Sequence, residues 1–302
     1  MLSLVIAVLV GCVLAVVGVV VFAGALLWRN SLPGRMPVQP TPVEYELPFS
    51  DISFQASDGV LIAGWLIEQA RPAPWIVLCH GFGTNRADVL DFARFLYRAG
   101  YSCLLFDFRG HGESVGHRTS FGWWERHDLD GALRYLKEQK ASDRVGLFGI
   151  SMGASVAIQE VAEHPEVAAV VADSSYTTLD ASIRRHLRLL WGFPEWPFAQ
   201  AARVAYALQY GVDPRRVSPE RALRKTGRAA VLLINGALDP RMTPRDAETL
   251  YEAAREPKAL WLVPGAGHLE SYVAAGVEYE RRVVEFFDQH LKAATSAGKS
   301  DF

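Results

Sequence analysis

The chain has 302 residues, 50% of them hydrophobic, and its formal net charge at pH 7 is −2. Such a chain is long and apolar enough to bury one sizeable core. The near-neutral charge and the lack of a polybasic run give no reason to expect a nucleic-acid partner. The three cysteines show neither a disulfide framework nor the spacing of a metal site, and no metal or organic cofactor is predicted.

The first predicted element is a membrane span. Residues 4–27 contain no charged side chain, and a helix over this range would extend roughly 36 Å, enough to cross a hydrocarbon core of ~30 Å. A cleaved signal peptide usually has a basic region before a shorter apolar stretch, and neither is present here. Leu9-Val10-Gly11-Cys12 matches a bacterial lipoprotein cleavage box, but the apolar run continues well past it. We therefore expect a retained transmembrane anchor over residues 1–30.

The span is followed by a short basic and proline-rich stretch. Arg29 and Arg35 lie on its C-terminal side, and no lysine or arginine precedes it. The positive-inside tendency favours a cytoplasmic location for the rest of the chain, with an external or periplasmic location as the alternative. Residues 31–48 are predicted to form an extended tether, because prolines recur at positions 33, 37, 40 and 42.

Residues 49–293 are predicted to form one α/β domain, followed by a disordered tail at 294–302. A hairpin opens it, with strands at 49–56 and 60–67 joined by the turn Ser57-Asp58-Gly59. Beyond it, strands are predicted at 75–79, 102–106, 145–148, 167–172, 231–236 and 259–263. Amphipathic helices are predicted at 87–99, 124–139, 154–163, 245–254 and 277–291. This alternation indicates a mostly parallel, doubly wound sheet.

The pattern G-x-S-x-G occurs at Gly149-Ile150-Ser151-Met152-Gly153, between a predicted strand and a predicted helix. A serine on a sharp turn between these elements needs small neighbours, because Cβ atoms there would collide with adjacent strands. The turn would project the hydroxyl from the top of the sheet, near a helix N-terminus where developing negative charge is favoured. A purely structural, glycine-rich turn is the alternative interpretation.

A serine hydroxyl needs a general base, and the base needs an acid that orients it. Asp239 and His268 each lie in a loop directly after an apolar strand, where active-site groups of an open α/β sheet are found. The chain order Ser, Asp, His is that of α/β-hydrolases. We predict Ser151 as nucleophile, His268 as general base and acid, and Asp239 as the orienting carboxylate. Asp173, which follows the preceding core strand, is the alternative acid.

Further motifs occur in the same order as in a known superfamily. His80-Gly81-Phe82-Gly83 follows the strand at 75–79, and Asp107-Phe108-Arg109-Gly110-His111-Gly112-Glu113-Ser114 follows the strand at 102–106. The spacing of Gly236, Asp239 and Pro244 and the closing Gly267-His268 also match. Over about residues 50–292 the chain resembles α/β-hydrolase-fold proteins, in particular the small membrane-anchored Bem46-like and serine-aminopeptidase-like groups.

The resemblance implies an α/β-hydrolase fold with a helical lid inserted at about 177–227. It places the oxyanion hole at the backbone N–H groups of Phe82 and Met152. It assigns structural roles in the turns to His80, Asp107, Arg109 and His111, while Glu113 and Ser114 border the site and could contact substrate. Four aromatic residues of the lid either line an acyl pocket or pack the lid onto the body: Trp191, Phe193, Trp196 and Phe198.

These features predict a membrane-anchored serine hydrolase that cleaves carboxylic esters or thioesters with an apolar acyl part through an acyl-enzyme. The expected partners are a small-molecule or lipid-like acyl substrate and the membrane, contacted through residues 4–27. A peptidase or other acyl hydrolase on the same fold is an alternative, although the basic segment 183–188 suits an anionic substrate or a lipid surface better than a substrate amine. A catalytically silent, membrane-anchored binding protein is the remaining alternative.

Overall fold

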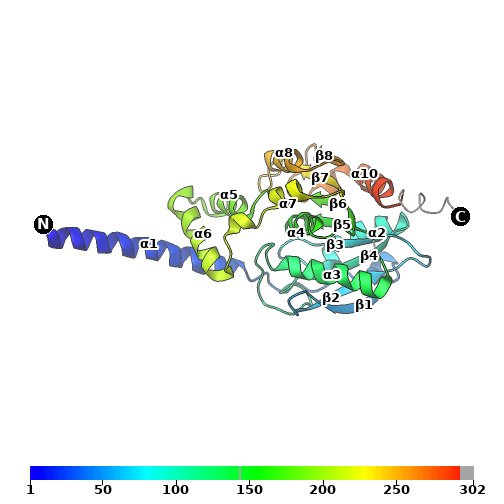
Figure 1. The fold of residues 1–302 in the computed structure, drawn as a ribbon, viewed down its shortest axis with the longest axis horizontal. Coiled ribbons are helices and arrows are strands. Elements are labelled where there is room, and N and C mark those ends of the chain that lie inside the picture. The colour runs from blue at the N-terminus through cyan, green and yellow to red at the C-terminus, as the bar shows by residue number, and fades with distance from the viewer. Residues whose placement is uncertain (143, 293–302) are drawn as a thin grey trace.

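The computed structural model describes residues 1–142 and 144–292; the predicted tail at 294–302 lies outside them. An eight-stranded sheet with helices on both faces forms the body, a helical insertion lies at one end of it, and a long N-terminal helix extends away beside that insertion (Figure 1). The predicted α/β fold is confirmed.

The sheet has the strand order β1-β2-β4-β3-β5-β6-β7-β8. Its strands are β1 (Ser50–Gln55), β2 (Leu61–Ile67), β3 (Trp75–Cys79), β4 (Ser102–Phe106), β5 (Val145–Ile150), β6 (Val167–Asp173), β7 (Ala230–Gly236) and β8 (Lys258–Val263). Strand β2 pairs antiparallel with β1 and β4, and all pairs from β4 to β8 are parallel. The winding direction reverses at β3, so the carboxyl ends of β3 and β5 border one crevice, where α/β proteins bind ligands.

Helices cover both faces, and each face has its own apolar core. One face carries α3 (Glu125–Lys140), α4 (Met152–Val161) and α8 (Pro244–Ala253), and the other carries α2 (Leu90–Arg98) and α10 (Val277–Phe287). Because both faces are covered, the central strands are buried along their whole length, which explains why they read as continuous apolar runs. Short helical segments lie at Pro42–Tyr45, Arg86–Val89, Ser271–Ala275 and Asp288–Lys292.

The insertion between β6 and β7 is helical. It contains α5 (Leu179–Trp191), α6 (Glu195–Tyr210), a 3₁₀ turn (Pro214–Arg216) and α7 (Pro219–Lys225). Thr178 caps α5 by accepting a hydrogen bond from the Ala181 N–H, and Gly192 ends α5 in a left-handed conformation with φ 65°. This insertion, residues 177–227, is called the lid below.

The N-terminal helix α1 (Leu2–Asn30) is long and apolar enough to cross a membrane, with a mean hydropathy of 3.3 over its most apolar window. A signal sequence near the N-terminus can also pass this test of length and hydropathy. Residues 1–18 are exposed, whereas the second half of α1 packs against α6 (Figure 1).

The stretch that follows α1 is fastened to the body. The Arg35 guanidinium donates hydrogen bonds to the carbonyl oxygens of Gly112, Ser114 and Gly116 at 2.8–2.9 Å. The Asn85 side chain donates to the carbonyls of Met36 and Pro37. The backbone of this proline-rich stretch therefore offers carbonyl groups that the body binds, so the stretch packs on the domain.

Candidate active site

Ser151 lies on the sharp turn between β5 and α4, with φ 50° and ψ −115°. This is a sparsely populated conformation for a non-glycine residue, and it costs on the order of 1–3 kcal/mol. The turn is tight enough that a Cβ added at Gly149 would lie 2.5 Å from the Gly153 carbonyl oxygen, and one added at Gly153 would collide with the Cys79 carbonyl. The Ser151 N–H donates to the Asp173 carbonyl at 2.8 Å, which helps to hold the turn.

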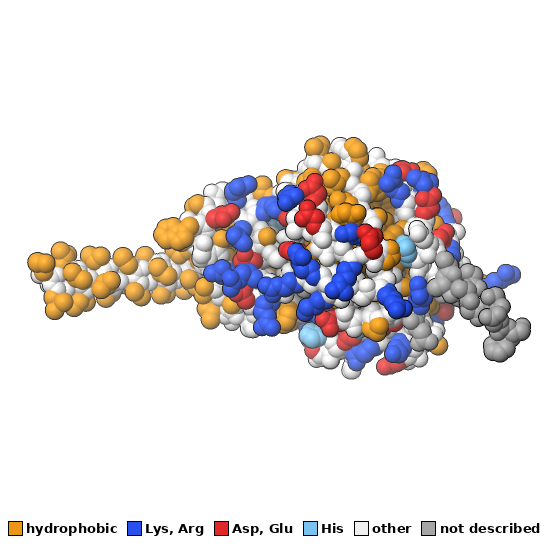
Figure 2. Space-filling model, turned by 45° about the horizontal axis from the view of Figure 1, so that its top comes forward, with side chains coloured by type: hydrophobic (Ala, Val, Ile, Leu, Met, Phe, Trp, Pro, Cys, Tyr) orange, Lys and Arg blue, Asp and Glu red, His pale blue; other side chains and the backbone are white. Residues whose placement is uncertain are grey.

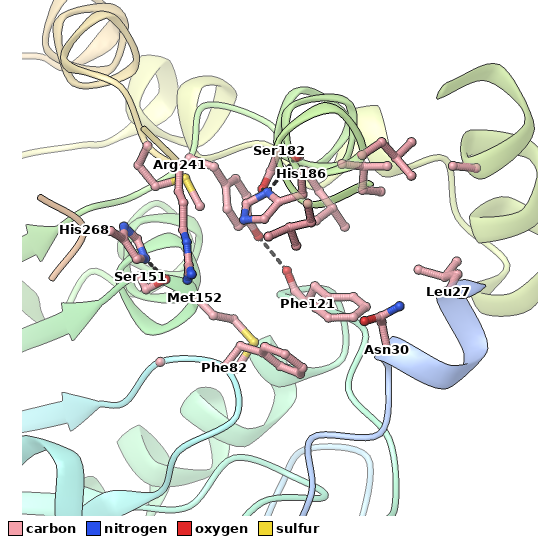
Figure 3. A pocket seen from close by; sticks show the side chains of 18 of the residues that line it. Leu27, Asn30, Phe82, Phe121, Ser151, Met152, Ser182, His186, Arg241 and His268 are labelled. Carbon is pink, nitrogen blue, oxygen red and sulfur yellow. Dashed lines mark hydrogen bonds between the residues drawn. The ribbon is translucent and has the colours of Figure 1, made fainter. Parts of the chain in front are cut away.

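The structure brings Ser151, His268 and Asp239 together. The Ser151 Oγ lies 3.1 Å from His268 Nε2, and His268 Nδ1 lies 2.7 Å from Asp239 Oδ2 (Figure 3). The buried carboxylate therefore sets the tautomer: Nδ1 carries the proton donated to Asp239, and Nε2 is free to accept the serine proton. The other carboxylate oxygen, Oδ1, accepts the N–H groups of Arg241 and Met242 at 2.8 and 2.9 Å.

Asp173, the alternative acid, makes different contacts. Its carboxylate accepts hydrogen bonds from the hydroxyls of Tyr279 at 2.9 Å, Ser174 at 2.9 Å and Ser271 at 3.3 Å. Burial raises its pKa to about 6, against the opposing effect of these hydroxyls. Asp239, and not Asp173, bonds to the imidazole.

Two backbone N–H groups are available beside the serine. Met152 is the first residue of α4, so its N–H has no acceptor within the helix. The loop after β3 approaches from the other side, since a Cβ added at Gly81 would lie 3.6 Å from the Ser151 Cβ. Phe82 is the next residue, and both Phe82 and Met152 line the pocket in front of Ser151. Both residues of the predicted oxyanion hole thus flank the nucleophile.

The pocket in front of Ser151 has a volume of about 280 Å³ and is mostly apolar. Its walls come from the loops after β3 and β7, from the start of α4, from α5 and from the C-terminal end of α1 (Figure 3). Arg241 is the only lysine, arginine, aspartate or glutamate that lines it in the part of the chain that the structure describes. His186 also lines it, and burial lowers the pKa of this imidazole, so it is neutral at pH 7.

The four aromatic residues of the lid have different surroundings. Trp191 lines the pocket, but Phe193 stacks on Phe198 with ring centroids 4.4 Å apart and meets Phe22 of α1 edge-on at 6.0 Å. Trp196 is 76% exposed. Trp191 therefore lines the pocket, as one of the two alternatives has it, whereas Phe193 and Phe198 pack within the lid and, through Phe193, on α1 rather than on the body.

The turns behind the site are held by buried polar groups. His80 Nε2 accepts the Phe108 N–H at 2.9 Å, and Nδ1 donates to the Gly81 carbonyl at 2.6 Å. Burial, together with the nearby His111, holds the pKa of His80 well below its usual value, so this ring is neutral and fixes the loop beside Ser151.

The second turn is fixed by its charged residues. Asp107 accepts the backbone N–H groups of Arg86 and Glu113 at 2.8 Å and pairs with the Arg86 guanidinium. Glu113 pairs with the same guanidinium, and Ser114 donates to the Asp107 carbonyl. Neither Glu113 nor Ser114 lines the pocket in front of Ser151, and both instead hold the turn after β4.

Two arginines of the basic lid segment 183–188 form ion pairs within the protein. Arg184 pairs with Asp180, and Arg185 pairs with Asp246. The charge that reaches the pocket comes instead from Arg241, which sequence reasoning missed although it lies two residues after Asp239. The α1 residues of the pocket wall were missed too, because a run of apolar residues does not distinguish lipid from protein as its neighbour.

Comparison with known proteins identifies the family of the chain. Residues 70–220 match the model of the family described as serine aminopeptidase, S33. The chain is 32% identical over 234 residues to the uncharacterized protein YqkD of Bacillus subtilis, and the match covers 76% of each chain. It is 26% identical to the alpha/beta hydrolase domain-containing protein WAV2 of Arabidopsis thaliana, over 93% of this chain and 92% of that one.

Solved structures give the same result. The Pyrococcus furiosus esterase Pf2001 superposes with a TM-score of 0.74 at 27% identity, covering 86% of this chain and 97% of the esterase. A polyketide transferase of Penicillium, GrgF, has the same fold at 23% identity and a TM-score of 0.65, covering 82% of this chain and the whole of that one. The chain therefore belongs to the serine aminopeptidase S33 family of the α/β-hydrolase superfamily and is an esterase-like hydrolase.

Proposed function

We propose that this protein is a membrane-anchored serine esterase that cleaves carboxylic esters or thioesters with an apolar acyl part. The observation that carries the proposal is the chain of contacts from Ser151 Oγ to His268 at 3.1 Å and from His268 to Asp239 at 2.7 Å, at the base of an apolar pocket.

The reaction proceeds through an acyl-enzyme. His268 Nε2 takes the hydroxyl proton as Ser151 Oγ attacks the carbonyl carbon, and Asp239 stabilises the imidazolium that forms. The oxyanion accepts hydrogen bonds from the N–H groups of Phe82 and Met152, and the loss of one such donor costs ~3–4 kcal/mol of transition-state stabilisation. The tetrahedral intermediate collapses as His268 protonates the leaving alcohol or thiol. Water, deprotonated by His268, then attacks the acyl-enzyme and releases the acid.

The pocket favours an ester over an amino-terminal peptide. An aminopeptidase binds the positive α-amine of its substrate, and a buried or partly buried amine needs a carboxylate partner. No aspartate or glutamate lines the pocket among the residues that the structure describes, and its one charge is the positive Arg241. The remaining wall is apolar, which suits the acyl part of an ester.

The membrane part of the proposal rests on α1. We take this helix as a retained single span, because its C-terminal end is bonded to the body: Arg118 donates to the Trp28 carbonyl and to Ser31 Oγ, each at 2.9 Å. A segment that was removed would leave these partners, and the pocket wall, incomplete. Arg29 and Arg35 follow the span and favour a cytoplasmic hydrolase domain.

Ester hydrolysis by the full chain in lipid nanodiscs tests the proposal. The wild type is expected to hydrolyse p-nitrophenyl acetate and butyrate, and Ser151→Ala to lower kcat by about 10⁴-fold or more. Ser53→Ala, on the exposed edge strand β1, is the matched control and should retain the wild-type rate. A Ser151→Ala variant within tenfold of wild type would remove this serine from the mechanism.

A further inference from the structure

We propose that the end of the transmembrane helix forms a wall of the acyl pocket, so that the enzyme takes an acyl chain directly from the bilayer. The inference rests on the proposed esterase function of Ser151 and extends it to the source and class of substrate. The substrate class is a long-chain ester or thioester resident in the membrane, rather than a short ester free in water.

One face of α1 lines the same cavity as the proposed nucleophile. Ala23, Leu26, Leu27 and Asn30 recur at helical spacing, and all four line the pocket together with Ser151 and His268. Leu27 and Asn30 lie across the cavity from His268, with Phe82 and Phe121 between them (Figure 3). The helix therefore supplies a wall on the side of the cavity opposite His268, where the tail of an acyl chain would lie.

This wall is held in place by packing against the lid. A Cβ added at Gly24 would lie only 3.6 Å from the Cβ of Ala205 on α6, so the two helices cross at close range. Ala23 is buried in a cluster of small residues that also contains Ala201 and Ala202. Small residues at a helix crossing allow the close approach that stabilises helix pairs in membranes.

The wall is also held at its end. The Thr119 N–H donates to the Ser31 carbonyl at 2.9 Å, beside the contacts that Arg118 makes to the last turn of α1. The neighbouring Phe121 lines the pocket, and its carbonyl accepts the Tyr176 hydroxyl at 2.7 Å. The end of α1 is thus joined to a loop that also lines the pocket in front of Ser151.

The length of the unpacked part of α1 places the lid against the bilayer. Residues 2–18 are exposed, and as a helix they span roughly 26 Å at ~1.5 Å per residue. A hydrocarbon core is ~30 Å thick, and the proposed span of residues 4–27 includes the next turn, which packs on the lid, so that turn would lie within apolar lipid. Phe193 of the lid contacts Phe22 in this turn and therefore reaches the same depth.

The lid surface has the composition that this depth requires. Apolar side chains gather on the lid where it meets α1 (Figure 2). The exposed large apolar residues of α5 and α6 are Leu189, Leu190, Trp191, Trp196, Val204 and Leu208. An exposed apolar surface of this kind marks a membrane or protein contact, and its position beside α1 favours the bilayer as that contact. An acyl chain can then pass from lipid into the chamber with its ester carbonyl at Ser151.

A larger side chain on the α1 wall of the pocket tests the inference. Leu26→Trp places a larger side chain on the pocket wall, whereas Ala25→Trp places the same side chain on the exposed face of the same turn. Both full-length variants are assayed in nanodiscs with p-nitrophenyl acetate and p-nitrophenyl laurate. Leu26→Trp is expected to lower kcat/KM for laurate by about tenfold or more while acetate changes by less than about twofold. Ala25→Trp should match wild type on both.

The outcomes separate this inference from the function on which it rests. If Leu26→Trp hydrolyses both esters in the wild-type ratio, α1 does not bound the acyl site and the inference is overturned. If the wild type hydrolyses neither ester, the proposed function itself fails. If Leu26→Trp loses acetate hydrolysis as well, Leu26→Ala is measured in its place. This variant enlarges the pocket and should raise the ratio of kcat/KM for laurate to kcat/KM for acetate. An unchanged ratio contradicts the proposal.

Discussion

Asp239 is held so that each carboxylate oxygen has its own task. One oxygen accepts the Nδ1–H of His268, and the other accepts the N–H groups of Arg241 and Met242, which fixes the carboxylate plane. Asp173 lies close by, at the end of β6, but its oxygens bond to three hydroxyl groups. Replacing Asp239 by an amide would therefore disturb the contact with His268, whereas replacing Asp173 would disturb only hydrogen bonds from hydroxyl groups.

Replacing each carboxylate by an amide should separate their roles. Asp239→Asn is expected to lower kcat for p-nitrophenyl acetate by about 10²–10⁴-fold, because the amide cannot hold the required tautomer of His268. Asp173→Asn should stay within about tenfold of wild type, since it leaves the His268 contact intact. Equal losses in the two variants would show that Asp173 shares the role of the acid.

The sequence was sufficient to predict the three residues that meet at the site. Ser151, Asp239 and His268 each follow a recognisable apolar strand, and strand ends of a parallel sheet converge. The sequence favoured Asp239 as the acid but left Asp173 as an alternative, because both follow core strands. The path of the loop after β7 decides between them, and that path depends on backbone contacts such as the Leu238 N–H donating to the Ala266 carbonyl.

At the scale of elements, His164 joins the end of α4 to the start of β6. It bonds to Glu160 at 3.1 Å and Glu166 at 3.1 Å and lies 3.4 Å from Asp130 of α3. Burial opposes its charge, but the hydrogen bonds and charges of Glu160 and Glu166 outweigh burial and raise the pKa of His164 to about 9. The protonated ring therefore stabilises the folded state.

This linkage predicts a pH-dependent effect of His164→Gln. The folded pKa lies above the unfolded value of ~6.5, so the stabilisation is fully present below pH ~6.5 and is lost as pH rises through about 9. The variant should melt on the order of 5 °C below wild type at pH 6 and converge with it at pH 10. Thermal unfolding of both full-length proteins at the two pH values provides the measurement. A Tm difference that grows with pH would have the wrong sign for this account.

The positions of strands could be predicted from the sequence where both faces of the strand are buried. The strands at β3 and β4 were predicted with the bounds that the structure has, because they are short apolar runs between turn residues. The helices of the lid were not positioned from sequence. Their apolar residues face three different neighbours, namely the pocket, α1 and the exposed surface, so no single periodicity describes them.

At the scale of the whole molecule, α1 is long and apolar enough to cross a membrane and also packs against the hydrolase domain. The sequence predicted a separate anchor and tether, because a helix that is apolar all round gives no periodicity from which a packed face can be recognised. The small-residue pair Ala23-Gly24 was a signal, since such residues favour close helix crossings, but Gly11 and Gly18 in the same run give the same signal without a neighbour. The structure places this pair against Ala205.

An engineered disulfide should report this crossing. Gly24→Cys combined with Ala205→Cys would bring two Cβ atoms to about 3.6 Å, within the range of disulfide geometry. In a Cys12→Ser background, which removes the exposed native thiol, the pair is expected to oxidise readily in nanodiscs. Gly18→Cys with Ala205→Cys is the matched control, because a Cβ at Gly18 has no neighbour within 4 Å. Equal oxidation of both pairs would contradict the seating of α1 on the lid.

The most direct test of the central claim, that Ser151 is an activated nucleophile, is covalent labelling of the full-length protein in nanodiscs by a fluorophosphonate, with the modified residue located by mass spectrometry. The account predicts one phosphonyl adduct, on Ser151, that is lost in Ser151→Ala and His268→Ala and persists in Ser53→Ala. An adduct on another serine, or undiminished labelling of His268→Ala, would contradict it.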